Sequence, residues 1–470
     1  MNSGGLVPKE IALFMRPQEI RGVNDVHFVN YRAKNQIRKN SPVEIVIPGS
    51  SADLVLLSQS RLHTKLRILN ADGTPIGFDE NGETKDVGLV NLAAHSIWRQ
   101  IDLQLNGQIV SPNISINYPY KAYIDVLTDY TKEQKERGIL QGHGFYADQA
   151  ESFDSGSNFG HNARVALTKH GQIVDFEAPL FLDVCKQNRA ILNGVEILIK
   201  AYQSADEFRL FNVSGETYQV EIVDCFFRAC HIKLDPAAVV GINEQLKRSP
   251  AIYPLMTSSV KAYTIPSQSF TYALEDLFNS YVPAVLYVTF TSSAAYSGDY
   301  KLNPFHFRHF KVNYLDFSID GKSCPGEALT PNFTEQLEWQ EAETEGEDGQ
   351  VVKKEGKFIA TGFINEYMNF CSPRTGSSSG GDATRSVGGG GSEGDQHGAG
   401  VSRLDFSNGY AVFAFRLKHY LSREAFSKLR RGYTRLNLRF SEALSEQVTI
   451  LIYGQFENQF EIDLVRNVAL

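Results

Sequence analysis

The sequence contains few cysteines and no long apolar segment. Five cysteines occur in 470 residues. So small and odd a number excludes a disulfide-stapled scaffold and fits a reducing compartment such as the cytosol or nucleus. The longest apolar runs, such as residues 283–290, fall far short of the ~18–20 residues of a membrane-spanning helix. The first residues also lack the basic start and apolar stretch of a secretory signal. We therefore expect no membrane span.

Motifs for catalysis and metal binding are missing from the sequence or stand in the wrong context. Ser378 lies in a G-x-S-x-G match and residues 389–394 match G-x-G-x-x-G. Neither match has the flanking strand and helix that such sites need. No C-x-x-C or H-E-x-x-H occurs, and His143, His161 and His170 of one long loop region are typical of solvated side chains. We interpret the chain as not an enzyme, with no catalytic residue, no cofactor and no metal ligand to assign.

The net charge is negative, with 54 Asp and Glu against 46 Lys and Arg, which argues against binding nucleic acid through overall basicity. The first 40 residues differ, because seven of their side chains are basic and three are acidic. A basic arm on an acidic protein is able to contact a phosphate backbone, and a surface strand with salt bridges is the alternative. The residues proposed to face nucleic acid are Arg16, Arg21, Arg32, Lys34, Arg38 and Lys39.

Aromatic and β-branched residues dominate the remaining sequence. The chain has 30 Phe and 21 Tyr against four Met, a mixture that favours strands. Short β-rich segments recur without the alternating helices of a parallel sheet, which indicates antiparallel sandwiches or barrels. The predicted strands are residues 43–47, 61–69, 101–110, 173–183, 195–201, 218–234, 260–265, 284–291, 307–319, 358–364, 411–417, 434–440 and 448–464.

Three helices are expected between these strands, at residues 118–136, 237–248 and 422–431. Each has a capping residue or proline at its start and a glycine or proline after its end. The helix at 237–248 lies at mid-chain, so we expect it to connect two halves. Residues 374–400 contain ten glycines and no Leu, Ile or aromatic residue. Such a segment adds nothing to a core and predicts a mobile surface insertion.

Two pairs of similar segments indicate an internal repeat. Residues 101–108 (IDLQLNGQ) resemble residues 315–322 (LDFSIDGK), and each is an alternating strand that runs into a hairpin turn. The Gly194 and Gly432 segments also correspond, because each glycine precedes a strand. The second pair is further apart along the chain than the first, and the excess falls in the region of the glycine-rich stretch. We therefore predict one β unit of about 200 residues present twice, with an insertion in the second copy.

Five further segments resemble a known family, the double jelly-roll major capsid proteins of Polinton (Maverick) elements and the related adintoviruses. The resemblance is clearest over residues 20–255, and the second half agrees in length and strand order with fewer motifs. The glycine-rich insertion has no counterpart, which leaves the shape of the outer loops open. The matching segments are NDVHFVNYRAKNQI at 24–37, VIPGSS at 46–51, VNLAAHSIW at 90–98, NYPYKAY at 117–123 and LNGVEILIK at 192–200.

This resemblance implies an all-β fold of two tandem eight-stranded jelly-roll sandwiches, with a few short helices in loops and at the connector. The expected divisions are an N-terminal arm (1–40), jelly roll 1 (41–234), a helical connector (235–250) and jelly roll 2 (251–470), which carries the insertion 374–400. Long loops, 111–172 and 325–400, are expected to carry trimer contacts and an exterior surface.

The resemblance also implies a function, that of a major capsid protein. Homotrimers would form pseudo-hexagonal capsomers that tile an icosahedral shell around double-stranded DNA, with a penton or minor capsid protein as a further partner. The chain would be made in the host cytoplasm, would assemble in the nucleus and would reside in the virion capsid. Two alternatives remain: a β-sandwich module that binds carbohydrate or protein, and a β-rich hydrolase whose paired carboxylates or triad only a structure would reveal.

Overall fold

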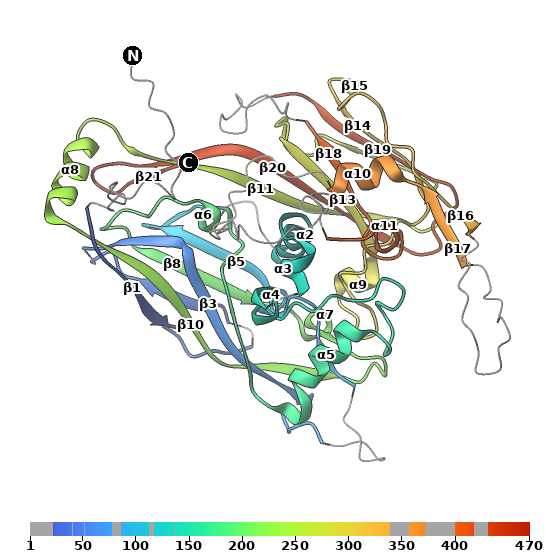
Figure 1. The fold of residues 1–470 in the computed structure, drawn as a ribbon, viewed down its shortest axis with the longest axis horizontal. Helices are drawn as coiled ribbons and strands as arrows, with labels where there is room; N and C mark the ends of the chain where they lie inside the picture. The colour runs from blue at the N-terminus through green and yellow to red at the C-terminus, as the bar shows by residue number, and fades with distance from the viewer. Residues whose placement is uncertain are drawn as a thin grey trace, which may run out of the picture.

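Most of the chain is described by a computed structural model, drawn in Figure 1. The described residues are 22–39, 41–50, 52–77, 86–111, 117–136, 138–338, 357–371, 400–417 and 431–470. Among them, no helix is long and apolar enough to span a bilayer. Two predicted segments lie outside the described residues. They are the helix 422–431, except its last residue, and nearly all of the glycine-rich segment.

The first half of the chain, residues 22–234, forms two antiparallel four-stranded sheets. The β1 sheet has the order β1-β10-β3-β7, and the β2 sheet has the order β2-β8-β5-β6. The strands of the β1 sheet are β1 (Val23–Arg32), β10 (Tyr218–Leu234), β3 (Leu54–Asn70) and β7 (Val174–Ala178). Those of the β2 sheet are β2 (Val43–Ile47), β8 (Ile197–Gln203), β5 (Trp98–Leu105) and β6 (Gln108–Ile109). A small ladder joins β4 (Gly88–Leu89) to β9 (Leu210–Phe211).

The second half, residues 251–470, repeats this strand order. The β11 sheet is β11-β20-β13-β18 with β21 beside β20, and the β12 sheet is β12-β19-β14-β15. The strands of the β11 sheet are β11 (Ala251–Ile265), β20 (Val448–Ile462), β13 (Val285–Ser292), β18 (Val412–Arg416) and β21 (Val468–Ala469). Those of the β12 sheet are β12 (Thr271–Glu275), β19 (Thr434–Phe440), β14 (Val312–Ile319) and β15 (Lys322–Ser323). In each half the eight main strands occupy the same sheet positions, which is a jelly roll present twice.

The predicted repeat is confirmed strand by strand. The hairpin β5–β6 has its counterpart in β14–β15, and β7 has its counterpart in β18. The connection between the fifth and sixth main strands is residues 110–173 in the first half and residues 324–411 in the second, so the second connection is the longer one. The insertion that distinguishes the copies therefore lies in this one connection. It holds the glycine-rich segment and the hairpin of β16 (Asn332–Glu338) and β17 (Lys357–Gly362).

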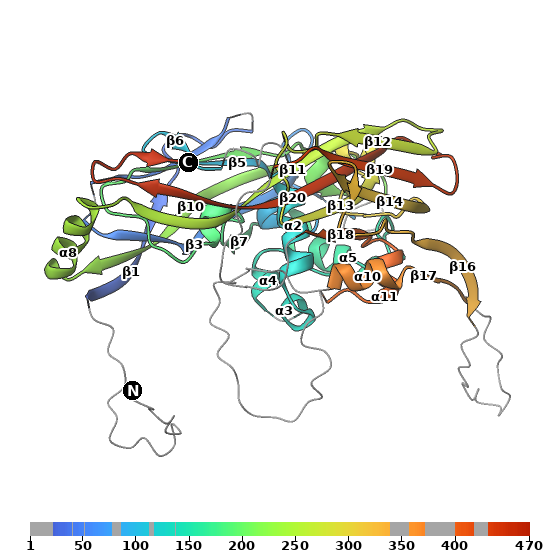
Figure 2. The same cartoon turned by 90° about the horizontal axis from the view of Figure 1, so that it is seen from above.

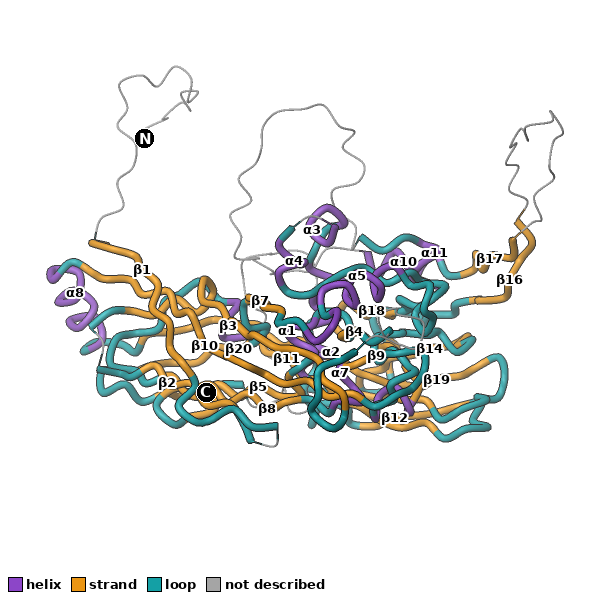
Figure 3. The backbone as a smooth tube through the Cα atoms, turned by 90° about the horizontal axis from the view of Figure 1, so that it is seen from below, coloured by secondary structure: helices purple, strands orange, loops and turns teal. Residues whose placement is uncertain are grey.

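Short helices fill the long connections and gather on one side of the sheets (Figures 2 and 3). The expected helix 118–136 is two helices, because Tyr130 adopts an extended conformation after α2. The expected helix 237–248 is present as α8, whose Asp235 cap accepts a hydrogen bond from the Ala237 amide. The helices are α1 (Ala93–Ser96), α2 (Tyr118–Asp129), α3 (Lys132–Glu136), α4 (Ile139–Gly142), α5 (Phe159–Leu167), α6 (Asp183–Lys186), α7 (Asp206–Arg209), α8 (Pro236–Leu246), α9 (Ser293–Ser297), α10 (Ile364–Cys371) and α11 (Arg403–Ser407), with a 3₁₀ turn at Lys169–Gly171.

Residues 22–39 differ from the expected N-terminal arm. Residues 23–32 form β1, which pairs along β10 from Val23 to Arg32. The basic residues of this segment suggested an arm, but the alternation of His27, Val29 and Tyr31 turns three side chains toward the sandwich interior. The first jelly roll therefore begins with β1.

Candidate functional site

The basic residues expected to face nucleic acid fall in two classes. Arg16 and Arg21 lie outside the described residues. Arg32 ends β1 and forms an ion pair with Asp224 at 2.9 Å, and Lys39 lies 2.5 Å from Asp206. Lys34 and Arg38 are exposed on the loop between β1 and β2. Within the described chain, the geometry of Arg32 and Lys39 matches the alternative of a surface strand with salt bridges.

The three loop histidines do not come together. His161 is buried on α5 and lies 2.9 Å from Asp86, while His170 is exposed in the 3₁₀ turn. His143 is buried beside α4, and its ring lies 6.0 Å from that of His95. Across the residues that the structure describes, no group of three or more His, Cys, Asp or Glu side chains is placed to hold a metal ion.

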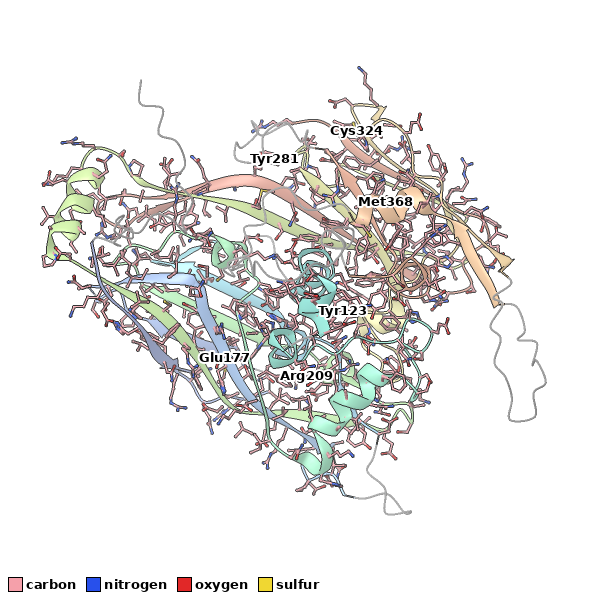
Figure 4. The ribbon with its side chains drawn as sticks, viewed as in Figure 1. Tyr123, Glu177, Arg209, Tyr281, Cys324 and Met368 are labelled. Atoms are coloured by element: carbon pink, nitrogen blue, oxygen red, sulfur yellow. The ribbon has the colours of Figure 1, made fainter. Side chains whose placement is uncertain are left out.

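The most elaborate polar site is the interface between the two halves, where α2 lies (Figure 1). Asn117 and Pro119 start this helix, and nearly all of its side chains are buried. Tyr123 stacks on Phe305 of the second half with ring centres 4.2 Å apart, and Tyr120 stacks on Tyr296 at 5.5 Å. Figure 4 shows Tyr123 on α2 in the middle of the molecule. Packed aromatic pairs of this kind stabilise an interface beyond the area they bury.

A buried ion-pair cluster joins α2 to the second half. Lys121 is fully buried and donates to Asp125 at 2.8 Å and to the Phe181 carbonyl at 2.6 Å. The other carboxylate oxygen of Asp125 accepts from the Tyr453 hydroxyl of β20 at 2.8 Å. Burial alone would lower the pKa of Lys121, but the charges of Asp125 and Asp183 outweigh it and hold that pKa well above its usual value. Lys121 therefore stays charged, and Asp125 connects it to the second half.

Asp183, at the start of α6, makes a second connection from the same cluster. It lies 3.2 Å from Lys121 and accepts from both the amide and the hydroxyl of Ser258 on β11, at 2.7 and 2.8 Å. A carboxylate that accepts from a backbone amide fixes the position of that strand as well as its own side chain. The cluster therefore holds two strands of the β11 sheet, β11 and β20, against the first half.

A further group of contacts binds residues 145–158 to the second half. The backbone carbonyl of Asp148 accepts from the Tyr410 hydroxyl at 2.6 Å, while its carboxylate pairs with Arg164 at 2.8 Å. Asp154 accepts from the Asn303 amide at 2.6 Å and lies 2.7 Å from Nδ1 of His306. The polar groups of this loop are thus satisfied across the interface, as buried polar groups require.

The third group of contacts lies at the turns that revealed the repeat. Arg466, in the turn after β20, donates to the Asn193 carbonyl at 2.6 Å and to its side-chain oxygen at 3.0 Å. Asn106, in the β5–β6 turn, donates to the Arg466 carbonyl at 2.8 Å. Contacts at three separate places fix the relative orientation of the two jelly rolls.

The interface residues were not identified from sequence as a functional site. One local signal existed, since Lys121 and Asp125 are four residues apart inside an otherwise apolar and aromatic helix segment. The loop 111–172 was expected to carry trimer contacts and an exterior surface. Much of it instead packs between the halves of the same chain, because α2 and residues 145–158 bind there.

Comparisons with known proteins agree with this architecture. No protein-family model matches the sequence. An uncharacterised protein of Caenorhabditis elegans is 25% identical over 306 residues, which cover 64% of this chain and 71% of the relative. A chain of the Sputnik virophage structure aligns with 100% of this chain and 93% of its own length, at a TM-score of 0.57 and 11% identity. The Faustovirus major capsid protein aligns with 96% of this chain and 92% of its own, at a TM-score of 0.51 and 9% identity. The fold is the double jelly roll of viral capsid proteins.

Proposed function

We propose that this chain is a major capsid protein that forms homotrimeric, pseudo-hexagonal capsomers. The observation that carries the proposal is the pair of jelly rolls with one strand order, fixed side by side by a buried interface. Because each chain contains two similar units, three chains present six similar faces around one axis. A closed ring of this kind is held together by complementary interfaces between its members. This role is structural and not enzymatic. The Faustovirus protein that shares the fold is itself a major capsid protein.

The proposal extends to the particle and its source. Capsomers tile an icosahedral shell around double-stranded DNA, with a penton or minor capsid protein as partner, after synthesis in the host cytoplasm and assembly in the nucleus. Membership of the Polinton and adintovirus group is proposed on the matching segments. The jelly-roll units are proposed as 41–234, with β1 added, and 251–470, joined by the connector 235–250.

Contact with the enclosed DNA is proposed for the basic residues near the N-terminus. Lys34 and Arg38 are exposed and would contribute more than Arg32 and Lys39, which already neutralise carboxylates. Phosphate contacts of this kind weaken steeply with salt. Binding of the purified capsomer to duplex DNA at two salt concentrations tests this part of the proposal, and salt-independent binding would contradict it.

Light scattering behind size-exclusion chromatography tests the capsomer. The mass of one chain is 52.4 kDa, and the proposal expects a stable species with three times that mass. Electron microscopy of that species should show a pseudo-hexagonal outline. A monomer that persists at high concentration would contradict the proposal and favour a β-sandwich binding module.

A further inference from the structure

The outer faces of the four sheets differ in polarity. In the β2 sheet the outer face is polar, with the Lys200–Glu44 ion pair and Asp102 on it. The outer face of the β12 sheet is also polar, since Arg435 and Arg439 of β19 are exposed there. Such faces are compatible with water. The other two sheets, β1 and β11, are equivalent in the repeat, and each has a patch of apolar side chains on its outer face.

The outer face of the β11 sheet is covered by the first half of the same chain. Every residue of β13 is buried, so this strand is enclosed on both sides. Tyr287 and Tyr453 stand opposite each other on the outer face and are 0% exposed. The cover includes α2, which follows β6 in the connection between the fifth and sixth main strands of the first half.

Part of the equivalent face of the β1 sheet is open among the described residues. Val26 and Phe28 of β1 remain 53% and 57% exposed. They stand opposite Ile232 and Cys230 of β10, which in turn stand opposite Leu54 and Leu56 of β3. Next to this patch the same face is charged, because Arg32 pairs with Asp224 and Arg228 of β10 pairs with Glu177. An exposed apolar patch bordered by ion pairs is the composition of a protein–protein contact surface.

We propose that the second half of a neighbouring copy of this chain covers the outer face of the β1 sheet. Within one chain, the first half covers the outer face of the β11 sheet. The proposed contact between two chains would be equivalent to this one, with the second half of the neighbour covering the β1 sheet. This inference rests on the proposed function and names the surfaces through which the trimer forms. Because the contact is head-to-tail and each chain supplies two of six similar positions, three copies close the ring.

The equivalence of the two jelly rolls also indicates which surface of the neighbouring chain makes this contact. Helix α10 lies between β15 and β18, as α2 lies between β6 and β7. It packs on its own jelly roll through Phe370, which is buried, and leaves Ile364 51% exposed. Met368, labelled in Figure 4, is 56% exposed on the same helix, and Leu404 of the adjacent α11 is 42% exposed. In Figure 1, α10 and α11 lie toward the right of the molecule and β1 lies toward the left. A head-to-tail contact between two copies requires its two surfaces to lie on opposite sides of the chain in this way.

The test compares the masses of single variants by light scattering. Phe28→Asp and Ile364→Asp each place a charge in the proposed contact, so both are expected to shift the trimeric species to a monomer. Ile109→Asp is the matched control, because Ile109 is 39% exposed on the edge strand of the polar β2 sheet, and it should remain trimeric. A trimeric Phe28→Asp or Ile364→Asp variant overturns this pairing while the capsomer stands. A monomeric wild type overturns the capsomer itself.

A milder variant covers the case in which a charge prevents folding. Phe28→Cys keeps the site apolar, and its reaction with a maleimide reports exposure, with wild type as the reference for the native cysteines. We expect slow labelling in the trimer and fast labelling after dissociation. Fast labelling in the intact trimer would overturn the proposal. Protection that persists in the monomer would place a segment of the same chain on this face and would overturn it too.

Discussion

At the scale of single residues, two histidines of the first half are held neutral inside the protein. Burial lowers the pKa of His95 well below its usual value and lowers that of His143 to about 4, with a further contribution from Arg61. A histidine with a lowered pKa in the folded state takes up its proton first in the unfolded chain as pH falls. The stability associated with His143 is therefore complete well above pH 6.5 and is lost as pH falls from there toward 4, and the stability associated with His95 is lost in the same direction.

Replacing His143 by Gln tests this effect. For a pKa that falls from 6.5 to about 4 on folding, acidification from pH 7.5 to 5 costs wild type roughly 2 kcal/mol through this group. The variant should lose that much less over the same interval. Urea unfolding at both pH values measures the difference. His170→Gln is the control, since His170 is exposed. Equal acid sensitivity of wild type and His143→Gln would refute the interpretation.

Asp125 is the residue on which the ion-pair cluster depends most. It accepts from Lys121, Lys186 and Tyr453, at 2.8 Å in each case. Asp125→Asn would leave Lys121 buried with less compensation, and breaking a buried pair in this way costs about 3–5 kcal/mol. The free energy of unfolding in urea should fall by that amount.

An exposed pair provides the control for Asp125. Lys132 and Glu136 lie 3.8 Å apart, and their side chains are 74% and 57% exposed. Glu136→Gln should change stability by at most about 0.5 kcal/mol, because water screens such pairs. If Asp125→Asn were equally mild, the cluster would not hold the halves together.

Sequence alone is a weak guide at this scale because these contacts join distant segments. Asp183 and Ser258, and likewise Asp148 and Tyr410, are far apart in the sequence and lie together only in the folded arrangement of the two jelly rolls. The i,i+4 spacing of Lys121 and Asp125 was visible in the sequence, but it fits an exposed helix face equally well. Their burial depends on the second half, which no local pattern encodes.

At the scale of elements, the two equivalent hairpins were predicted well because turn chemistry is local. Gly107 follows Asn106 in the β5–β6 turn, and Gly321 follows Asp320 in the β14–β15 turn. Both glycines have a left-handed conformation, with φ of +80° and +79°. The Asn-Gly and Asp-Gly signals report this conformational requirement directly.

Gly107→Ala and Gly321→Ala test whether the two turns are energetically equivalent. No atom lies within 4 Å of an added Cβ at either site, so the cost is backbone strain alone, about 1–2 kcal/mol. Urea unfolding should give the same loss for both variants. Gly77→Ala is the control, because its surroundings are equally open and its φ is not left-handed. Unequal losses at Gly107 and Gly321 would contradict the equivalence.

Short strands with a weak apolar pattern were missed. β12 spans only Thr271–Glu275, and Leu274 is its one buried residue. It is a strand because it pairs with β19 along its whole length. The predicted strands 43–47, 218–234 and 434–440 match β2, β10 and β19 fully, since each alternates or forms an apolar run long enough to read locally.

At the scale of the whole molecule, the equivalent strand orders explain why the repeat was detectable at low sequence similarity. Hairpin turns and strand spacing survive because the sheets require them, while the long connections diverge in length and content. Much of the connection 110–173 of the first half, including α2 and residues 145–158, folds between the jelly rolls. Its longer counterpart, 324–411, carries α10 and the glycine-rich segment. The connections therefore distinguish the two copies, and the sheets make them alike.

The shared interface also predicts that both jelly rolls unfold together. Losing the first half would expose Tyr287, Leu451 and Tyr453, all of which are 0% exposed. The second half has no other cover for this apolar face among the described residues, so it should not persist alone. In hydrogen exchange followed by mass spectrometry, the amides of β8 and β19 should lose protection at the same urea concentration. Asp125→Asn should lower that concentration for both strands. Two separate midpoints in wild type, with β19 opening while β8 stays protected, would show that each jelly roll is stable by itself.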